Sequence, residues 1–110
     1  MVMICEQGDI VAVDFEPSVG HEPNKYRPAL VVSSNTFNAR SSLTAVCPIT
    51  SVNNGYPLHV GIDHEEVRGF VCVEQVRTVD LSNRRCKRLA QANADDMELV
   101  LSYVASIFGV

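Results

Sequence analysis

Four side chains suited to acid, base or phosphate chemistry lie close together near the start of the chain. A carboxylate or an imidazole can accept a proton, and a guanidinium offers a planar set of N–H donors that matches a phosphate group. Charged loop residues are more often simply solvated, so this short spacing does not by itself define a site. The four residues are His21, Glu22, Lys25 and Arg27.

Positive charge is concentrated in a second segment, residues 77–88. The chain has 9 basic and 13 acidic residues, and this net charge of -4 excludes a protein that coats nucleic acid by bulk attraction. The segment itself carries five basic residues against Asp80, so it is locally positive. A phosphate chain or an acidic disordered partner can dock on such a strip, and a solvated strand edge protected by its charges explains it as well. The basic residues are Arg77, Arg84, Arg85, Lys87 and Arg88.

The cysteines and histidines show no spacing typical of a metal or redox site. The four cysteines form no C-x-x-C pair, and the three histidines are scattered. We therefore expect free, buried thiols, no metal and no cofactor. His59 is expected to be an exposed strand residue rather than a ligand. The chain also lacks a phosphate-cradling loop and a nucleophile elbow.

Length and composition indicate an ordinary globular protein. We expect residues 1–110 to form one domain, since 46% of the residues are hydrophobic and 20% are charged. No apolar run approaches the ~20 residues that a bilayer span requires, and Met1–Gln7 is too short for a secretory signal. The sequence therefore predicts a soluble, cytoplasmic protein with no membrane contact.

Short strands must position the chemically active side chains. The first two thirds of the chain consist of brief apolar runs separated by turn residues, which is typical of a β-meander or small barrel. Between the first two runs, Glu16–Tyr26 contains two prolines and a glycine, so we expect a long irregular loop that gates or contacts a substrate. The predicted strands are Gly8–Phe15, Pro28–Ser34, Leu43–Thr50, a strand containing Leu58, Val60 and Ile62, Gly69–Glu74, and a short strand near Arg84–Leu89.

The run Leu43–Thr50 alternates in polarity, and it contains a proline. The alternation places Cys47 and Ile49 on one face and Val46, Pro48 and Thr50 on the other. Because Pro48 cannot donate to a ladder, we expect this strand to lie at an edge, to bulge or to finish near Pro48. A distorted strand end would aim Thr50 outward.

A single helix is predicted at the end of the chain. Asn93 can cap its start, and the acidic residues that follow favour the positive end of a helix dipole. At most one helical turn is expected at Asn35–Ala39. Strands followed by one helix predict an α+β fold, a twisted sheet or half-open barrel with the helix on one face. The apolar face of the helix consists of Met97, Val100, Leu101, Val104, Ile107 and Phe108.

Five blocks of the sequence, taken in order and with their spacing, resemble the MazF/PemK toxins of bacterial toxin-antitoxin modules. Each block is short, but five in register are far more specific than one motif. The terminal amphipathic helix also resembles that of the family. The blocks are GDIVAVDFEPSVGHE at Gly8–Glu22, YRPALVVSSNTFN at Tyr26–Asn38, VCPITS at Val46–Ser51, GYP at Gly55–Pro57 and EQVRTVD at Glu74–Asp80.

The resemblance implies a small SH3-like β-barrel of the CcdB/MazF type that forms a homodimer. It also implies a metal-independent endoribonuclease that cuts single-stranded RNA at short sequences and is neutralised by an antitoxin with an acidic, disordered tail. By motif, the catalytic pair falls on Arg27 and Thr50, and the family's loop glutamate falls on Glu22. The implied RNA contacts are His21, Lys25, Ser51, Gln75, Arg77, Arg84, Arg85 and Lys87.

The chemistry needs no metal, because RNA supplies its own nucleophile in the 2'-OH. Arg27 would neutralise the phosphate, Thr50 would bind an oxygen or relay a proton, and Glu22 or His21 would accept a proton. Structural roles remain open for each: an Arg27–Glu22 ion pair that closes the loop, a turn cap at Thr50, and a turn hydrogen bond rather than base reading at Gln75.

The sequence departs from the family in two places. Ala12 stands where the family usually has tryptophan, so base stacking would fall to Phe15, Tyr26 or Tyr56. Pro23 stiffens a loop that relatives often loosen with glycine, so RNA specificity cannot be transferred. Two other functions stay open: a non-catalytic toxin of the same fold that poisons DNA gyrase through its C-terminal helix, and an inactive adaptor.

Overall fold

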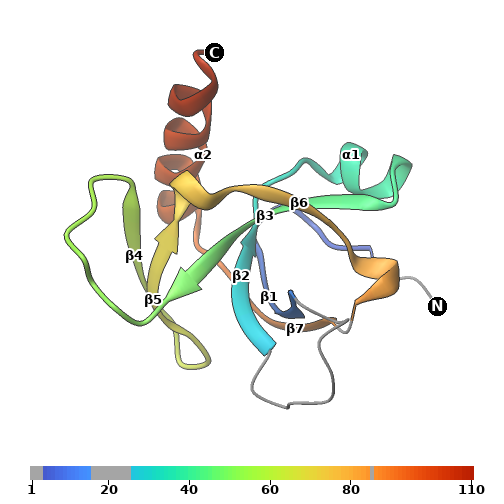
Figure 1. Ribbon diagram of the computed structural model, residues 1–110, viewed down its shortest axis with the longest axis horizontal. Helices are drawn as coiled ribbons and strands as arrows, with labels where there is room; N and C mark the ends of the chain where they lie inside the picture. Colours follow the sequence, from blue (N-terminus) through green and yellow to red (C-terminus); the bar gives the residue numbers. More distant parts are fainter. Residues whose placement is uncertain (1–3, 16–25, 85) are drawn as a thin grey trace.

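The computed structural model describes residues 4–15, 26–84 and 86–110, and its main feature is an antiparallel sheet curled into a half-open barrel (Figure 1). The strand order is β4-β5-β3-β2-β1-β7, with β6 paired to β3. The α+β class predicted from the sequence is confirmed. The strands are β1 (Asp9–Asp14), β2 (Tyr26–Val31), β3 (Leu43–Thr50), β4 (His59–Asp63), β5 (Arg68–Cys72), β6 (Arg77–Asp80) and β7 (Cys86–Gln91).

Strand β3 lies inside the sheet and ends at Thr50, so of the three alternatives expected for it the edge position is wrong and the finish near Pro48 is confirmed. It pairs with β2 on one side, and on the other side with β6 over its first half and with β5 at Ile49 and Thr50. Pro48 falls between the residues paired with β6 and those paired with β5. The missing N–H therefore lies where the strand changes partners, and no ladder bond is lost.

The side chains of β3 alternate between its faces as predicted, and the two faces enter two apolar cores, which the sequence did not predict. Cys47 and Ile49 belong to a core shared with β4, β5 and the C-terminal helix, which we call the helix-side core. Val46 belongs to a second core shared with β1, β2 and β6, which we call the barrel core. Because both faces of β3 are covered, its backbone is held firmly on the way to Thr50.

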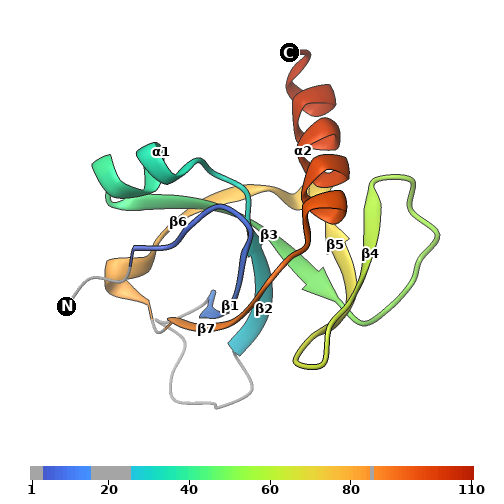
Figure 2. The same ribbon diagram turned by 180° about the vertical axis from the view of Figure 1, so that it is seen from behind.

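The C-terminal helix α2 (Ala94–Phe108) covers the helix-side core and stands beside β4 and β5 (Figure 2). Asn93 caps it as predicted, because its side chain accepts a hydrogen bond from Asp96 N at 2.8 Å. Val100 is fully buried, whereas Ile107 and Phe108 are 40% and 65% exposed. The last turn therefore projects beyond the sheet with an apolar surface.

Shorter elements differ from the sequence prediction at their ends. The first helix, α1 (Asn35–Arg40), is slightly longer than one turn, because Ser34 caps it by accepting a hydrogen bond from Phe37 N. β2 begins at Tyr26, a residue that the prediction placed in the loop. β5 ends at Cys72 and gives way to a 3-10 turn, η2 (Val73–Gln75), and a second turn, η3 (Leu81–Asn83), precedes β7.

The four cysteines are free, as expected, and three of them are buried. Among the described residues, no helix is long and apolar enough to cross a membrane.

Candidate active site

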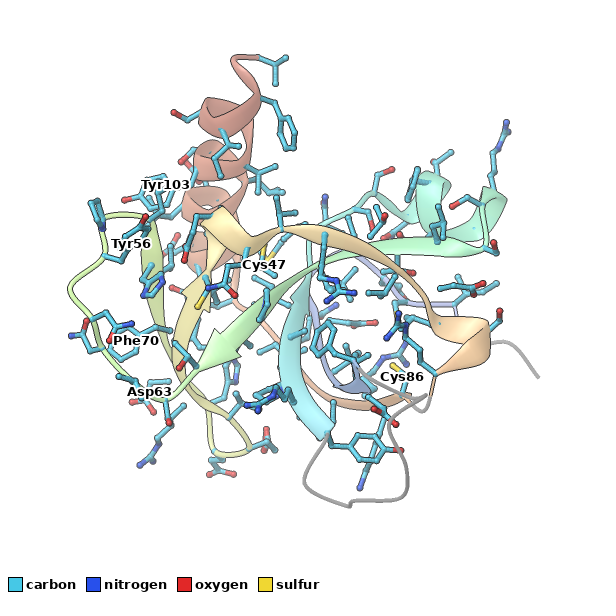
Figure 3. All side chains as sticks on the ribbon, viewed as in Figure 1. Cys47, Tyr56, Asp63, Phe70, Cys86 and Tyr103 are labelled. Atoms are coloured by element: carbon cyan, nitrogen blue, oxygen red, sulfur yellow. The ribbon has the colours of Figure 1, made fainter. Side chains whose placement is uncertain are left out.

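A groove of about 930 Å³ lies where β2 begins and β3 and β5 end. Tyr56, one of its lining residues, is labelled in Figure 3. Its walls come from β2, the end of β3, the segment before β4, and the β5–η2 junction. It therefore joins three blocks of sequence that lie far apart along the chain. The lining residues are Tyr26, Arg27, Pro28, Pro48, Ile49, Thr50, Ser51, Val52, Asn54, Tyr56, His59, Arg68, Cys72, Glu74 and Gln75.

The strand register brings Arg27 and Thr50 to one place on the groove wall. Ala29 of β2 lies opposite Pro48 of β3. Continuing this antiparallel register by two residues sets Arg27 opposite Thr50, and the period of two places both side chains on the face that Ala29 and Pro48 share. Both residues line the same groove.

The same face continues across β5 and β4. Thr50 is paired with Phe70, and Cys72, two residues further along β5, is paired with His59. Cross-strand partners and residues two apart share a face, so Thr50, Cys72 and His59 all point from one side of the sheet. The strand register, rather than any local motif, therefore determines which side chains form the groove floor.

Both predicted catalytic side chains have donor capacity available. Arg27 is exposed, and its side chain makes no ion pair or hydrogen bond with any residue in 4–15, 26–84 or 86–110. Thr50 Oγ1 accepts a hydrogen bond from Val52 N at 3.2 Å, which leaves its own O–H free to donate. The turn cap considered for Thr50 is therefore present, and it is compatible with an outward donor.

Gly69 fixes the backbone of Thr50. A Cβ atom at this position would lie 2.4 Å from Thr50 O and 3.1 Å from Ile49 Cγ2. Only glycine allows β5 to approach the end of β3 this closely, and the approach determines where the Thr50 hydroxyl lies.

The expectation that His59 is an exposed strand residue is wrong. Its side chain is only 5% exposed, and Nε2 lies 3.1 Å from Glu74 Oε2. The Tyr56 ring covers it at a centroid distance of 5.4 Å. The His59 side chain lies on the face of β4 opposite to Val60, which belongs to the helix-side core. Tyr56, which precedes β4, and Glu74, which follows β5, bury it there.

Sequence reasoning missed Glu74 and Cys72 as part of the groove. Burial raises the pKa of the Cys72 thiol, and the neighbouring Glu74 raises it further. Burial likewise raises the pKa of Cys47 to about 12, with Cys72 and Glu74 adding to the effect. Both thiols are therefore protonated at neutral pH, and neither is an activated nucleophile. No sequence signal marked them, because their place depends on the pairing of β4 with β5.

The remaining predicted residues divide into three groups. Ser51 and Gln75 line the groove, and Gln75 Nε2 donates to Glu74 Oε2 at 3.4 Å. Tyr26 and Tyr56, two of the three aromatic residues considered for stacking, also line it. Four predicted residues lie outside the described residues: His21, Glu22, Lys25 and Arg85.

The third group, the basic segment, lies outside the groove lining, and most of its cations already have partners. The guanidinium of Arg77 lies 5.3 Å from the centre of the Phe15 ring. Arg84 donates to the backbone carbonyls of Asp14, at 3.2 Å, and of Phe15. Arg88, which sequence analysis did not assign to RNA, pairs with Asp9 at 3.0 Å. Lys87 is exposed.

Comparison with curated proteins gives several relatives of similar length. The endoribonuclease toxin ChpB of Escherichia coli is 40% identical over 102 residues, which is 87% of each chain. The endoribonuclease PemK of Escherichia coli is 35% identical over 109 residues, covering 93% of this chain and 80% of PemK.

Solved structures agree with this relationship. A MazE-MazF complex from Deinococcus radiodurans contains a chain that superposes with a TM-score of 0.85 and 32% identity, over 98% of both chains. A MazF structure from the same organism gives a TM-score of 0.84 and 35% identity. A family model described as PemK-like, MazF-like toxin of type II toxin-antitoxin system matches residues 6–108. The chain therefore belongs to the PemK-like, MazF-like toxin family.

Proposed function

We propose that this chain is a sequence-specific endoribonuclease toxin that cleaves single-stranded RNA without a metal ion. The observation that carries the proposal is the placement of Arg27 and Thr50 on one face of an open groove, with donors free of described partners. Relatives that are 35–40% identical over most of the chain carry the name endoribonuclease, which supports the same activity here.

The reaction requires positioning and charge neutralisation more than covalent chemistry by the protein. The 2'-oxygen attacks the adjacent phosphorus, the bond from phosphorus to the 5'-oxygen breaks, and the products are a 2',3'-cyclic phosphate and a 5'-OH. Negative charge grows on the non-bridging oxygens, where the fork of Arg27 and the hydroxyl of Thr50 donate.

Two protons must also move. The 2'-OH loses one, and the departing 5'-oxygen gains one. Thr50 can relay a proton, and Glu22 or His21 is proposed as the acceptor, because a guanidinium is too basic for that role.

The RNA bases have aromatic and polar partners along the groove. Tyr56 and Tyr26 are 52% and 38% exposed, and stacking on an aromatic ring contributes about 1–3 kcal/mol per base. We assign stacking to these two rings, since Arg77 already covers Phe15. Gln75 and Ser51 at the groove wall can donate to or accept from base edges.

Two protein partners complete the proposal. An antitoxin with an acidic, disordered tail would compete with RNA for Arg27 and for the exposed Lys87. A second copy of the chain would cover the projecting end of α2, where Val104 and Phe108 border a hollow of about 340 Å³ with Val76 and Ala45. The similar MazF chain of Deinococcus radiodurans was solved as a MazE-MazF complex, so that relative binds a protein partner.

The test is cleavage of a mixed-sequence RNA in EDTA, followed by mapping of the cut ends. Specific cuts with 2',3'-cyclic phosphate ends should appear, and Arg27→Ala or Thr50→Val should each reduce the rate by about 10²- to 10³-fold. Arg40→Ala, which removes an exposed arginine from α1, is the matched control and should cut normally. Intact RNA together with stalled gyrase would instead support the hypothesis that the chain poisons DNA gyrase, in which the exposed end of α2 would make the contact.

A further inference from the structure

Three potential metal ligands of different chemistry converge on the groove floor. One ligand atom from each of His59, Cys72 and Glu74 lies within 4.8 Å of the other two. The register explains the convergence, because His59 is the cross-strand partner of Cys72 and Glu74 follows β5 in the turn η2. Cys72 and Glu74 follow His59 by 13 and 15 positions in the sequence, so sequence spacing gave no sign of the cluster.

The hydrogen bond between His59 and Glu74 does not account for all the polar atoms present. His59 Nδ1 and Glu74 Oε1 are buried, and neither has a hydrogen-bond partner among the described residues. The His59 side chain is 95% buried, since only 5% of it is exposed. A buried polar atom without a partner is costly, so this arrangement is unfavourable unless something else binds there.

We propose that His59, Cys72 and Glu74 form a Zn²⁺ site in the groove. An imidazole nitrogen, a thiolate sulfur and a carboxylate oxygen are the three ligand types that Zn²⁺ takes in proteins. Ca²⁺ and Mg²⁺ prefer oxygen ligands alone, so the cysteine and histidine argue against them. Movements of about 1 Å would bring the three atoms to the spacing of a tetrahedral ion with bonds of about 2.0–2.3 Å.

Three protein ligands leave the fourth position of the ion open to the groove. All three residues line the groove that also contains Arg27 and Thr50, and the backbone of Thr50 lies beside the Cys72 thiol. An RNA phosphate oxygen or a water can take the open position. Binding would also draw Glu74 away from Gln75, whose side chain it now accepts from. Bound Zn²⁺ therefore alters RNA binding in the groove, a consequence that rests on the proposed function, whereas the metal site itself does not.

The metal site is tested without RNA. Chain freed of metal is titrated with Co²⁺, which reports a cysteine ligand by its sulfur-to-metal charge-transfer absorption, and with Zn²⁺ by calorimetry. One ion per chain and a charge-transfer band are expected. Cys72→Ala should abolish the band, and His59→Gln and Glu74→Gln, which each remove a direct ligand, should weaken Zn²⁺ binding by more than the ~100-fold that loss of an outer partner can cost.

The control variants replace a histidine and a cysteine that lie outside the cluster. His64→Gln, beside β4, and Cys86→Ser, on β7, should bind Zn²⁺ like the unmodified chain. Circular dichroism of each variant, together with Zn²⁺ binding by Cys72→Ser, shows whether a loss of binding comes from loss of the thiolate ligand or from loss of the fold. Absence of the band in the unmodified chain, or binding that survives Cys72→Ala, would overturn the site.

The effect of Zn²⁺ on RNA binding has its own measurement. Binding of a 2'-deoxy oligonucleotide, which cannot be cut, is followed by fluorescence anisotropy with and without Zn²⁺. Altered oligonucleotide affinity in the unmodified chain but not in Cys72→Ala is expected, and equal affinity would exclude a shared site. If the chain cuts no RNA, the Co²⁺ titration still decides whether the metal site exists.

Discussion

The groove and the basic segment both carry arginines, and the structure uses them differently. Arg27 is exposed in the groove and free of partners among the described residues. Arg84 holds two backbone carbonyls at the end of β1, and Arg88 holds the buried Asp9. A cation without partners can bind a ligand at no cost to the fold, whereas Arg84 and Arg88 would have to give up fold-stabilising bonds first.

This difference shows that a local excess of charge is not by itself a binding surface. The segment 77–88 is more basic than the groove, yet the contacts of Arg84 reach residues about 70 positions away. Function and stability should therefore separate cleanly between the two regions.

The largest effect is expected for Arg27→Met. The cleavage rate should fall by about 10²- to 10³-fold, because a transition-state donor is removed, while the free energy of unfolding should change by less than about 0.5 kcal/mol. Arg27→Lys should restore only part of the rate, because an ammonium cannot form the two-pronged contact. Single-turnover cleavage and urea unfolding measure the two quantities. A large loss of stability would mean that Arg27 is a structural residue like Arg84.

Arg84→Met should show the reverse pattern. Loss of the two charge-assisted hydrogen bonds to the end of β1 should lower the free energy of unfolding by about 1–2 kcal/mol, since the side chain is only partly buried. Cleavage per folded molecule should be close to normal. If cleavage drops as much as in Arg27→Met with stability intact, Arg84 contacts RNA and the contrast between the regions is wrong.

Gly69→Ala should affect stability and activity together. The added Cβ would collide with Thr50 O, so β5 or the end of β3 must move, at a cost of about 1–3 kcal/mol. Because the same movement shifts the Thr50 hydroxyl, the cleavage rate should fall as well. Gly55→Ala is a useful comparison, because a Cβ there meets no atom within 4 Å, and its cost comes only from forcing alanine into the left-handed backbone conformation. Normal cleavage by folded Gly69→Ala would show that Thr50 is placed by other contacts.

The smallest effect is expected for Lys87→Gln. Lys87 is exposed and lies outside the groove lining, so stability and cleavage at moderate salt should change little. If it touches an RNA phosphate, the slope of log affinity against log salt should fall by about 0.7. An unchanged slope would remove Lys87 from the RNA surface.

The sequence predicted most of the local elements, because their patterns are local, but it did not predict β6 (Arg77–Asp80). Alternation along Leu43–Thr50 placed each side chain on the correct face, and Asn93 marked the helix start. Of the alternatives for Pro48, the finish of the strand near it is correct and the edge position is wrong, because a missing donor can also lie where a strand changes partners.

The groove could be predicted only in part, because strand register decides it. The resemblance to the family located Arg27 and Thr50, and the register then set them opposite each other. The His59–Cys72–Glu74 cluster depends on the pairing of β4 with β5, and no spacing rule reveals such pairing. The engagement of Arg84 likewise depends on a contact between distant segments.

The prolines of the groove wall affect how β2 and β3 are joined at their open end. Val32 N donates to Ala45 O, so every second residue of β2, including Pro28, occupies a hydrogen-bonding position toward β3. Pro28 has no N–H to donate, and the two strands beyond Ala29 and Pro48 are therefore not tied by that bond. The pairing of β2 with β3 accordingly stops at Ala29 and Pro48, before it reaches Arg27 and Thr50. A single imino acid in β2 thus accounts for the open end of the sheet at which the two side chains lie.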